Sequence, residues 1–304
     1  MTSSQYDVIV IGEGVAGLTA ANALARAGLT TATLEAQLFG GLIINVNELD
    51  PAPEGREVGG AEFASELVQS NQDLGVTSIS EPVTGIEAGG ATKRVVTAGG
   101  SYGARHVVIA SGGRLRKLGI PGEAEYEGRG VSQCADCDGP MYQNEAVVVV
   151  GGGDSALQEA IVLTRYCGKV HLVHRGSQFR ARAHFIEQVK GNGKIATVWN
   201  AQLEEIAGGK MVERARIRHA DGRTEEMPCA GVFAYVGLEP NAGFLPPQYA
   251  RDAAGFLVTN DSLQTSVPGV WAAGAVRSGC GGLISDAMDD ARRVGKSLTA
   301  PRFF

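Results

Sequence analysis

The chain has 304 residues, of which 44% are hydrophobic and 20% are charged, and its net charge at pH 7 is −6. This length suits about two domains, and the moderate acidity argues against a nucleic-acid-binding protein, which normally presents a basic face. No apolar run approaches the ~20 residues that span a bilayer, and the first residues carry no basic leader. The sequence therefore predicts a globular cytoplasmic protein without nucleic-acid or membrane partners.

The first informative segment, residues 6–36, has the pattern of a strand, a turn, a helix and a second strand. We expect a buried parallel strand at 8–11, a helix at 15–27 and a strand at 31–34.

The turn of this segment carries Gly12, Gly14 and Gly17 in G-x-G-x-x-G spacing. The first glycine permits a tight turn, the second lets the backbone approach a pyrophosphate, and the third permits close contact between helix and strand. The helix N-terminus favours the negative charge of that pyrophosphate. Glu35 follows the second strand, where an acid accepts hydrogen bonds from ribose hydroxyls. The segment predicts a dinucleotide site.

The same pattern recurs in residues 146–175, with Gly151, Gly153 and Ala156 in G-x-G-x-x-A spacing. Its second strand ends on His174 and Arg175 instead of an acid. A basic end holds a 2′-phosphate, so this second site favours NADP(H). Two sites of opposite character suggest FAD in the first and a nicotinamide in the second. The alternative is a degenerate repeat that binds nothing.

Gly/Pro-rich joints lie near 119–123 and 237–246. The tail adds a strand-like run at 270–273, a glycine-rich loop and a long helical pattern. The expected fold is α/β, with two three-layer, Rossmann-like nucleotide-binding domains, the second inserted into the first. The predicted domain ranges are 1–116, 117–243 and 244–304, of which the first and last form one domain.

Of the five cysteines, Cys134 and Cys137 alone form a C-x-x-C pair. A structural zinc site needs four ligands, and no second such pair exists. A structural disulfide over so short a loop stabilises little and would not persist in a reducing cytosol. A redox role suits the spacing best, because a helix N-terminus favours the reactive thiolate. Cys280, between two glycines, is either an additional reactive thiol or an inert packed residue.

The chain resembles the low-molecular-weight thioredoxin reductase family nearly end to end. Besides the first glycine turn, Glu35 and the pair Gly40-Gly41, the matching segments are VVIASGGRLRKLGIPGE at 107–123, CADCDG at 134–139, GGGDSALQEA at 151–160, HRGSQFRA at 174–181 and VPGVWAAG at 267–274.

The resemblance implies an FAD-binding domain built from both ends of the chain and a middle domain that binds NADPH or NADH and carries the cysteines. It also implies that the middle domain rotates and that the protein forms a homodimer. Cys137 would face the flavin, Cys134 would exchange with the substrate, and Asp138 would transfer a proton or, alternatively, cap a helix. The implied FAD-binding residues are Gly12, Gly14, Ala16, Gly17, Glu35, Gly40, Gly41, Ala110, Gly112, Gly274 and Ala275. The implied NAD(P)H-binding residues are Gly151, Gly153, Asp154, Ser155, Ala156, His174, Arg175 and Arg180.

The chain departs from the family at both expected cofactor sites. Gly176 replaces the second of two adjacent arginines, and Ala275 replaces an aspartate that contacts FAD in the family. An expected Arg-Gln pair is missing near 281–283, and Leu42 stands where a glutamine is common.

The working hypothesis is an FAD-dependent disulfide oxidoreductase that passes electrons from NAD(P)H to a thioredoxin-like protein or a small-molecule disulfide. The alternatives are a dithiol oxidase that uses oxygen, a reductase fed by ferredoxin or another protein donor, and a flavin-binding redox sensor without turnover.

Overall fold

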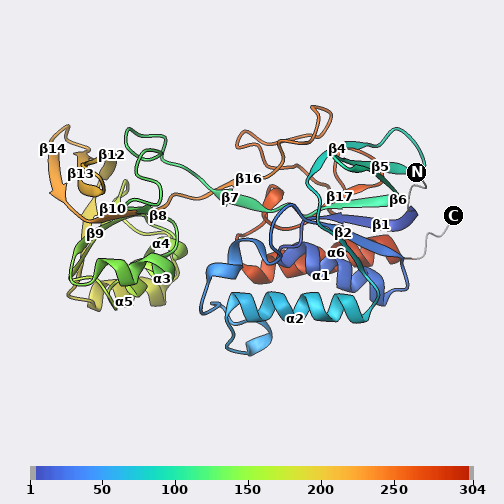
Figure 1. Ribbon diagram of the computed structural model, residues 1–304, viewed down its shortest axis with the longest axis horizontal. Helices are drawn as coiled ribbons and strands as arrows, with labels where there is room; N and C mark the ends of the chain where they lie inside the picture. The colour runs from blue at the N-terminus through green and yellow to red at the C-terminus, as the bar shows by residue number, and fades with distance from the viewer. Residues whose placement is uncertain (1–4, 301–304) are drawn as a thin grey trace. The chain divides into compact units, whose positions relative to one another are not determined.

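The computed structural model describes residues 5–300, with only the backbone of Glu54 (Figure 1). The chain divides into two compact units: unit 1 runs to Arg114 and resumes at Leu238, and unit 2 is Leu115–Gly237. The predicted domain limits lie a few residues from these. The predicted α/β class, with one Rossmann-like unit inserted into another, is confirmed.

Unit 1 is built around a seven-stranded sheet, with strands β7 and β16 forming a separate two-stranded sheet. Its strands are β1 (Gln5–Ile11), β2 (Thr31–Leu34), β3 (Thr77–Ile79), β4 (Val83–Glu87), β5 (Lys93–Thr97), β6 (Gly100–Ile109), β7 (Gly113–Leu115), β16 (Leu238–Pro240) and β17 (Val270–Ala272). Its helices are α1 (Val15–Arg26), α2 (Gly60–Asp73) and α6 (Ile284–Thr299), with 3-10 turns η1 (Gly41–Asn45), η2 (Pro53–Gly55) and η4 (Gly274–Val276).

The sheet of unit 1 has the order β3-β2-β1-β6-β5-β4, and β17 also pairs with β6. Strand β6 can serve three neighbours because it is ten residues long: its first half pairs antiparallel with β5 and its end pairs parallel with β17. The carboxyl ends of β1, β2 and β17 therefore meet at one edge of the sheet, which is where nucleotides bind in parallel sheets.

The central strand β1 is apolar on both faces, as a covered parallel strand must be. Val8 and Val10 pack against α1 and α6, while Ile9 and Ile11 face a second cluster that includes the fully buried Tyr249. Figure 1 shows α1, α2 and α6 on one side of this sheet. Each fully buried aliphatic side chain contributes roughly 1.5–3 kcal/mol to folding.

Unit 2 has a five-stranded parallel sheet in the order β11-β10-β9-β15-β8 and a three-stranded antiparallel sheet, β12-β13-β14. The strands are β8 (Val131–Ser132), β9 (Ala146–Gly151), β10 (Lys169–His174), β11 (Ile195–Trp199), β12 (Ala201–Gly208), β13 (Val212–His219), β14 (Thr224–Pro228) and β15 (Gly231–Tyr235). The helices are α3 (Ala135–Asp138), α4 (Asp154–Leu163) and α5 (Ala183–Gly191), with a 3-10 turn η3 (Gly139–Tyr142).

Two cores form on the two faces of the parallel sheet. On one face, Leu157 and Leu163 of α4 pack on Val147, Val149 and Leu172. On the other face, residues of β12 and β13 cover Val148, Val150 and Val173 (Figure 1).

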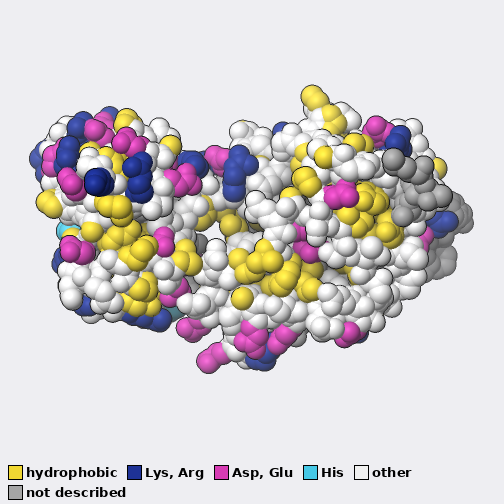
Figure 2. Space-filling model, in the orientation of Figure 1, with side chains coloured by type: hydrophobic (Ala, Val, Ile, Leu, Met, Phe, Trp, Pro, Cys, Tyr) yellow, Lys and Arg dark blue, Asp and Glu magenta, His cyan; other side chains and the backbone are white. Residues whose placement is uncertain are grey.

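The outer surface of β12–β14 is covered by paired charges rather than by another layer. Arg214 and Arg216 both pair with Glu226, and Arg216 also pairs with Glu205. Figure 2 shows basic and acidic side chains interspersed over this part of unit 2. Such exposed pairs contribute little stability, but they protect sheet surfaces from association.

Among residues 5–300, no helix combines the length and the apolar character needed to cross a membrane.

Candidate active site

The first glycine turn leaves no room for side chains at two of its three glycines. Gly12 has φ +104°, and a Cβ there would lie 2.4 Å from the carbonyl oxygen of Ala110. A Cβ on Gly17 would lie 1.8 Å from the carbonyl oxygen of Gly12. Gly14 differs, because it precedes α1 and nothing lies within 4 Å of its Cβ position. The open space at the helix N-terminus fits a pyrophosphate.

Glu35 lies beside this turn, with its carboxylate held by backbone donors. Oε2 accepts from the N–H of Glu13 at 2.9 Å, and Oε1 accepts from the next two N–H groups along the chain. These bonds orient the carboxylate but leave acceptor capacity for a ribose hydroxyl.

Sequence reasoning missed Glu13, which is buried at 6% exposure inside the turn. Its Oε1 accepts hydrogen bonds from the hydroxyls of Thr33, at 2.5 Å, and Ser78, at 2.6 Å. The sequence could have indicated Glu13, because an acidic residue stands between two glycines of a turn that is usually too buried for a charged side chain.

The other predicted FAD-binding residues meet at the same edge of unit 1. Gly40 bridges to Gly14, and its N–H donates to the carbonyl oxygen of Glu13 at 2.7 Å. Gly274, at φ +74°, lies against α1, since its Cβ would be 2.6 Å from that of Ala16. The other predicted FAD-binding residues lie next to the ones already described. Gly41 follows Gly40, Ala110 contacts Gly12, Gly112 comes shortly after β6, and Ala275 lies in η4.

The turn at Gly274 is held by an acid from α6, although Ala275 cannot supply one. Asp290, 3% exposed, accepts from the N–H of Gly274 at 3.1 Å. Arg277 donates to both carboxylate oxygens of Asp290, each at 2.6 Å. This pair joins two elements that the sequence pattern did not connect.

Replacing Asp290 by asparagine should destabilise unit 1 by about 3–5 kcal/mol, because the Arg277 side chain, 11% exposed, is left without its partner charge. Urea denaturation followed by circular dichroism measures this change. The matched control is Asp289→Asn: Asp289 has a 70% exposed side chain and pairs with Arg292 on the surface, so it should change stability by less than about 1 kcal/mol. Equal effects of the two variants would contradict a structural role for the Arg277–Asp290 pair.

The second glycine turn, in unit 2, repeats the geometry of the first. A Cβ on Gly151 would lie 2.5 Å from the Cβ of Ala156 and from the carbonyl oxygen of Tyr235. Gly153 precedes α4, and nothing lies within 4 Å of its Cβ position. An open helix N-terminus of this kind again fits a pyrophosphate.

The basic segment after β10 folds back onto this turn. The Nε2 of His174 lies 3.0 Å from the carbonyl oxygen of Gln178, and a Cβ on Gly152 would lie 2.2 Å from the imidazole ring. Arg182, which sequence reasoning did not select, donates from its backbone N–H and its Nε to Asp154 at 2.7 and 2.5 Å. His174 and Asp154 therefore hold the loop in place, while Ser155 stays exposed at the start of α4.

Arg175 and Arg180 are exposed, and neither forms an ion pair with any residue between 5 and 300. Arg175 lines a pocket of about 220 Å³ next to the carboxyl ends of β10 and β11. The other lining residues come from a later part of the chain, which sequence reasoning did not connect to this site: Asn200, Gln202, Arg218, His219, Ala220 and Gly222. The unpaired guanidinium of Arg175 at this pocket suits a phosphate.

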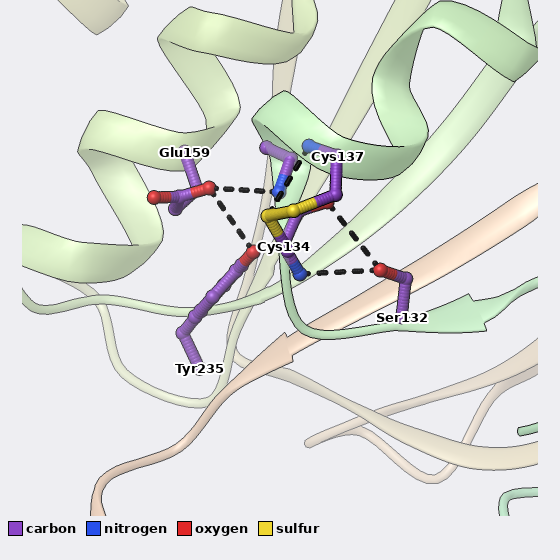
Figure 3. The surroundings of a disulfide bond; sticks show 6 residues. Ser132, Cys134, Cys137, Glu159 and Tyr235 are labelled. Carbon is purple, nitrogen blue, oxygen red and sulfur yellow. Dashed lines mark hydrogen bonds between the residues drawn. A yellow bond between two sulfur atoms is a disulfide. The ribbon is translucent and has the colours of Figure 1, made fainter. Parts of the chain in front are cut away.

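Cys134 and Cys137 form a disulfide at the start of α3, with an S–S distance of 2.07 Å (Figure 3). The N–H of Cys134 donates to the hydroxyl of Ser132 at 3.1 Å, which fixes the chain before the helix. The N–H of Cys137 donates to the Sγ of Cys134 at 3.1 Å. A donor aimed at this sulfur would stabilise a thiolate at Cys134.

Asp138 follows the second cysteine and is partly exposed. Its side chain makes no capping hydrogen bond to η3, the turn that it precedes. The carboxyl group of Asp138 is therefore available for proton transfer, and the alternative role of helix cap finds no support.

The three other cysteines lie outside this pair. Burial raises the pKa of Cys167 to about 11 and that of Cys229 to about 12, so both thiols are protonated at neutral pH. Burial also raises the pKa of Cys280. Within the part of the chain that the structure describes, no group of three or more His, Cys, Asp or Glu side chains is placed to hold a metal ion.

Two glycine turns, each after a parallel strand of its own unit, with a cystine in the second unit, define the class of flavin- and nicotinamide-dependent disulfide oxidoreductases. The chain belongs to the pyridine nucleotide-disulphide oxidoreductase family, whose pattern matches residues 6–291. It is an FAD-dependent disulfide oxidoreductase that uses FAD and a pyridine nucleotide.

The similar proteins narrow this assignment. The chain is 39% identical over 277 residues to a thioredoxin reductase of Treponema pallidum, with 90% of each chain covered. It is 37% identical over 279 residues to a thioredoxin reductase of Bacillus subtilis, covering 90% of this chain and 87% of that one. Its structure matches crystalline Lactococcus lactis thioredoxin reductase with a TM-score of 0.93 at 36% identity, covering 96% and 97% of the two chains. The resemblance to this family is confirmed.

Proposed function

We propose that this enzyme carries electrons from NADPH to the disulfide of a thioredoxin-like protein, with Cys134 and Cys137 as its redox-active pair. The observation that carries the proposal is the cystine at the start of α3, in the same unit as the second glycine turn. The thioredoxin reductases that it resembles support the partner. The same resemblance supports a homodimer in the cytoplasm.

Each unit would bind one of the two cofactors. The first glycine turn, Glu35 and the Gly274 turn would hold FAD, and the second turn with Arg175 and Arg180 would hold NADPH. Bound FAD supplies a two-electron carrier between a nicotinamide and a disulfide.

In the exchange step, the thiolate of Cys134 attacks one sulfur of the partner's disulfide, and the other partner sulfur leaves as a thiolate. The thiolate of Cys137 then attacks the Sγ of Cys134, which re-forms the Cys134–Cys137 disulfide and releases the partner's second sulfur as a thiolate. Both partner thiolates take protons from water. Asp138 accepts the proton of the Cys137 thiol and returns one when the pair is next reduced.

A nicotinamide donor is preferred over a protein donor because the second nucleotide site is intact apart from Gly176. Gly153 leaves the helix N-terminus open, and two unpaired arginines remain nearby. The same observation disfavours an oxygen-dependent dithiol oxidase, which would need no such site.

Replacing Arg175 by glutamine should weaken NADPH binding about 10- to 100-fold and leave NADH binding unchanged. The lost contact is a charge-assisted hydrogen bond to the 2′-phosphate, worth roughly 1.5–3 kcal/mol. Anaerobic stopped-flow absorbance of the FAD-loaded enzyme near 450 nm, with NADPH and then NADH, measures both affinities.

The control is Arg216→Gln, which removes the same charge from β13, where the guanidinium is paired with Glu226. It should leave both affinities within about twofold. Failure of both nucleotides to bleach a photoreducible flavin in the unsubstituted enzyme would overturn the nicotinamide donor and favour a protein donor.

A further inference from the structure

A carboxylate from another helix binds the first residue of the cysteine-bearing helix. Oε2 of Glu159, on α4, accepts from the N–H of Ala135 at 3.0 Å and from the hydroxyl of Tyr235 at 3.2 Å. Ala135 is fully buried, and Tyr235 is 8% exposed. Figure 3 shows the carboxyl group of Glu159 pointing towards the turn that carries Cys134, with the hydroxyl of Tyr235 bound to it.

This contact removes a donor from the neighbourhood of the sulfurs. The N–H of Cys134 is bound to Ser132, and that of Ala135 is bound to Glu159. The N–H of Cys137 donates to the Sγ of Cys134. The hydrogen bond to Glu159 therefore keeps the N–H of Ala135 from donating to a thiolate at Cys134.

Glu159 also adds charge to this neighbourhood. Burial raises the pKa of its carboxyl, the hydrogen bonds from Ala135 and Tyr235 lower it, and the negative charge of Asp136 raises it further. Burial raises the pKa of Tyr235, so this phenol stays a neutral donor to the carboxylate. The carboxyl group of Glu159 therefore lies against the first turn of α3, bound to the residue that follows Cys134.

We propose that Glu159, held by Tyr235, is a positioning residue that makes the Cys134–Cys137 pair a stronger reductant. It fixes the first N–H of α3 and places a negative charge that disfavours a thiolate on Cys134. The inference rests on the proposed redox role of this pair.

Reduction of the Cys134–Cys137 disulfide to one thiol and one thiolate takes two electrons and one proton. Two electrons, from the enzyme's own donor or from an added dithiol, break the bond between the two sulfurs. One sulfur takes a proton and the other remains a thiolate. If the thiolate is on Cys134, it accepts a hydrogen bond from the N–H of Cys137. A nearby carboxylate raises the energy of the thiolate form but not that of the disulfide, so it shifts the equilibrium towards the disulfide.

The test is Glu159→Gln, which keeps an oxygen to accept from Ala135 and removes the charge. The FAD-loaded protein is equilibrated anaerobically at pH 7 in buffers of reduced and oxidised dithiothreitol, alkylated, and digested with trypsin. The peptide Gly130–Arg165 contains both cysteines and no other. Its alkylated fraction reports the redox state of the pair directly.

The expected result is an approximately tenfold shift of this equilibrium towards the dithiol, which corresponds to a potential about 30 mV less negative. The matched control, Glu187→Gln, removes an exposed carboxylate from α5 and should shift the equilibrium less than twofold. A merely structural clamp would leave the equilibrium of Glu159→Gln unchanged. That result, or a shift towards the disulfide, would overturn the proposal.

The readout separates this inference from the proposed function. The dithiothreitol equilibrium depends on neither NADPH nor a thioredoxin-like partner. If the predicted shift appears but NADPH fails to reduce the flavin, the proposed donor is wrong and the role of Glu159 stands. If the pair of the unsubstituted protein stays a disulfide across the buffers, both fail.

Discussion

Serine at either Cys134 or Cys137 should abolish disulfide reduction, with a loss of at least about 10³-fold, while reduction of the flavin by a nicotinamide persists. A hydroxyl cannot form the disulfide that links the enzyme to its partner, and removing one member of such a unit costs about as much as removing both. Steady-state reduction of a thioredoxin-like protein, and stopped-flow reduction of the flavin, measure the two activities separately.

The two cysteine variants also distinguish the proposed roles. With Cys137→Ser, the thiol of Cys134 should form a stable mixed disulfide with the partner, because no second thiol can resolve it. With Cys134→Ser, no such adduct should accumulate. Non-reducing electrophoresis and mass spectrometry detect the adduct, and Cys280→Ser serves as a control that keeps full activity. An adduct with Cys134→Ser alone would reverse the roles assigned to the two sulfurs.

Local patterns in the sequence predicted the parts of the fold that depend on neighbouring residues. The strand expected at 8–11 is confirmed within β1, which begins at Gln5, and the helix expected at 15–27 is confirmed as Val15–Arg26. Both were predictable because the spacing of apolar residues and the backbone freedom of glycine depend on only a few neighbouring residues. The exact ends were not, because helix and strand termini depend on contacts from elsewhere in the chain.

The contacts that support the site could not be predicted in the same way. Glu159 lies 24 residues from Ala135 and 76 from Tyr235. No periodicity relates residues so far apart, and each appears ordinary in its own segment. The Arg277–Asp290 pair similarly joins η4 to α6. Ala275 replaces the aspartate that the family pattern places here, and in the structure Asp290 of α6 binds the Gly274 turn.

The resemblance to a known family located the chemistry, and the structure adds how individual residues are held. His174 illustrates the difference. The pattern placed it among the NAD(P)H-binding residues, and in the structure its ring packs on the turn and its Nε2 lies by Gln178. Arg175 and Arg180 stay exposed. A run of basic residues in a sequence does not show which side chains are free to contact a ligand and which stabilise the loop.

Alanine at Gly14 and alanine at Gly17 should have opposite consequences, although the two glycines share one turn. At Gly17 the new Cβ would lie 1.8 Å from a backbone oxygen that cannot move independently. Such overpacking should cost at least about 3 kcal/mol and leave little folded protein. At Gly14 the backbone angles, φ −75° and ψ −178°, suit alanine, and the Cβ meets nothing within 4 Å. The fold should therefore survive with a loss of about 1 kcal/mol, from the poorer helix cap.

Gly14→Ala should lower the affinity for FAD at least about tenfold. The added methyl group would occupy the space through which a pyrophosphate approaches the helix N-terminus. Flavin absorbance after dialysis, compared with urea denaturation of the flavin-free protein, separates loss of cofactor from loss of fold. Gly153→Ala is the matched control: its Cβ position is equally open, but it precedes α4 in unit 2. This variant should keep FAD and lose the nicotinamide. If both variants retained both cofactors, neither helix N-terminus would hold a pyrophosphate, and the assignment of the two turns would be wrong.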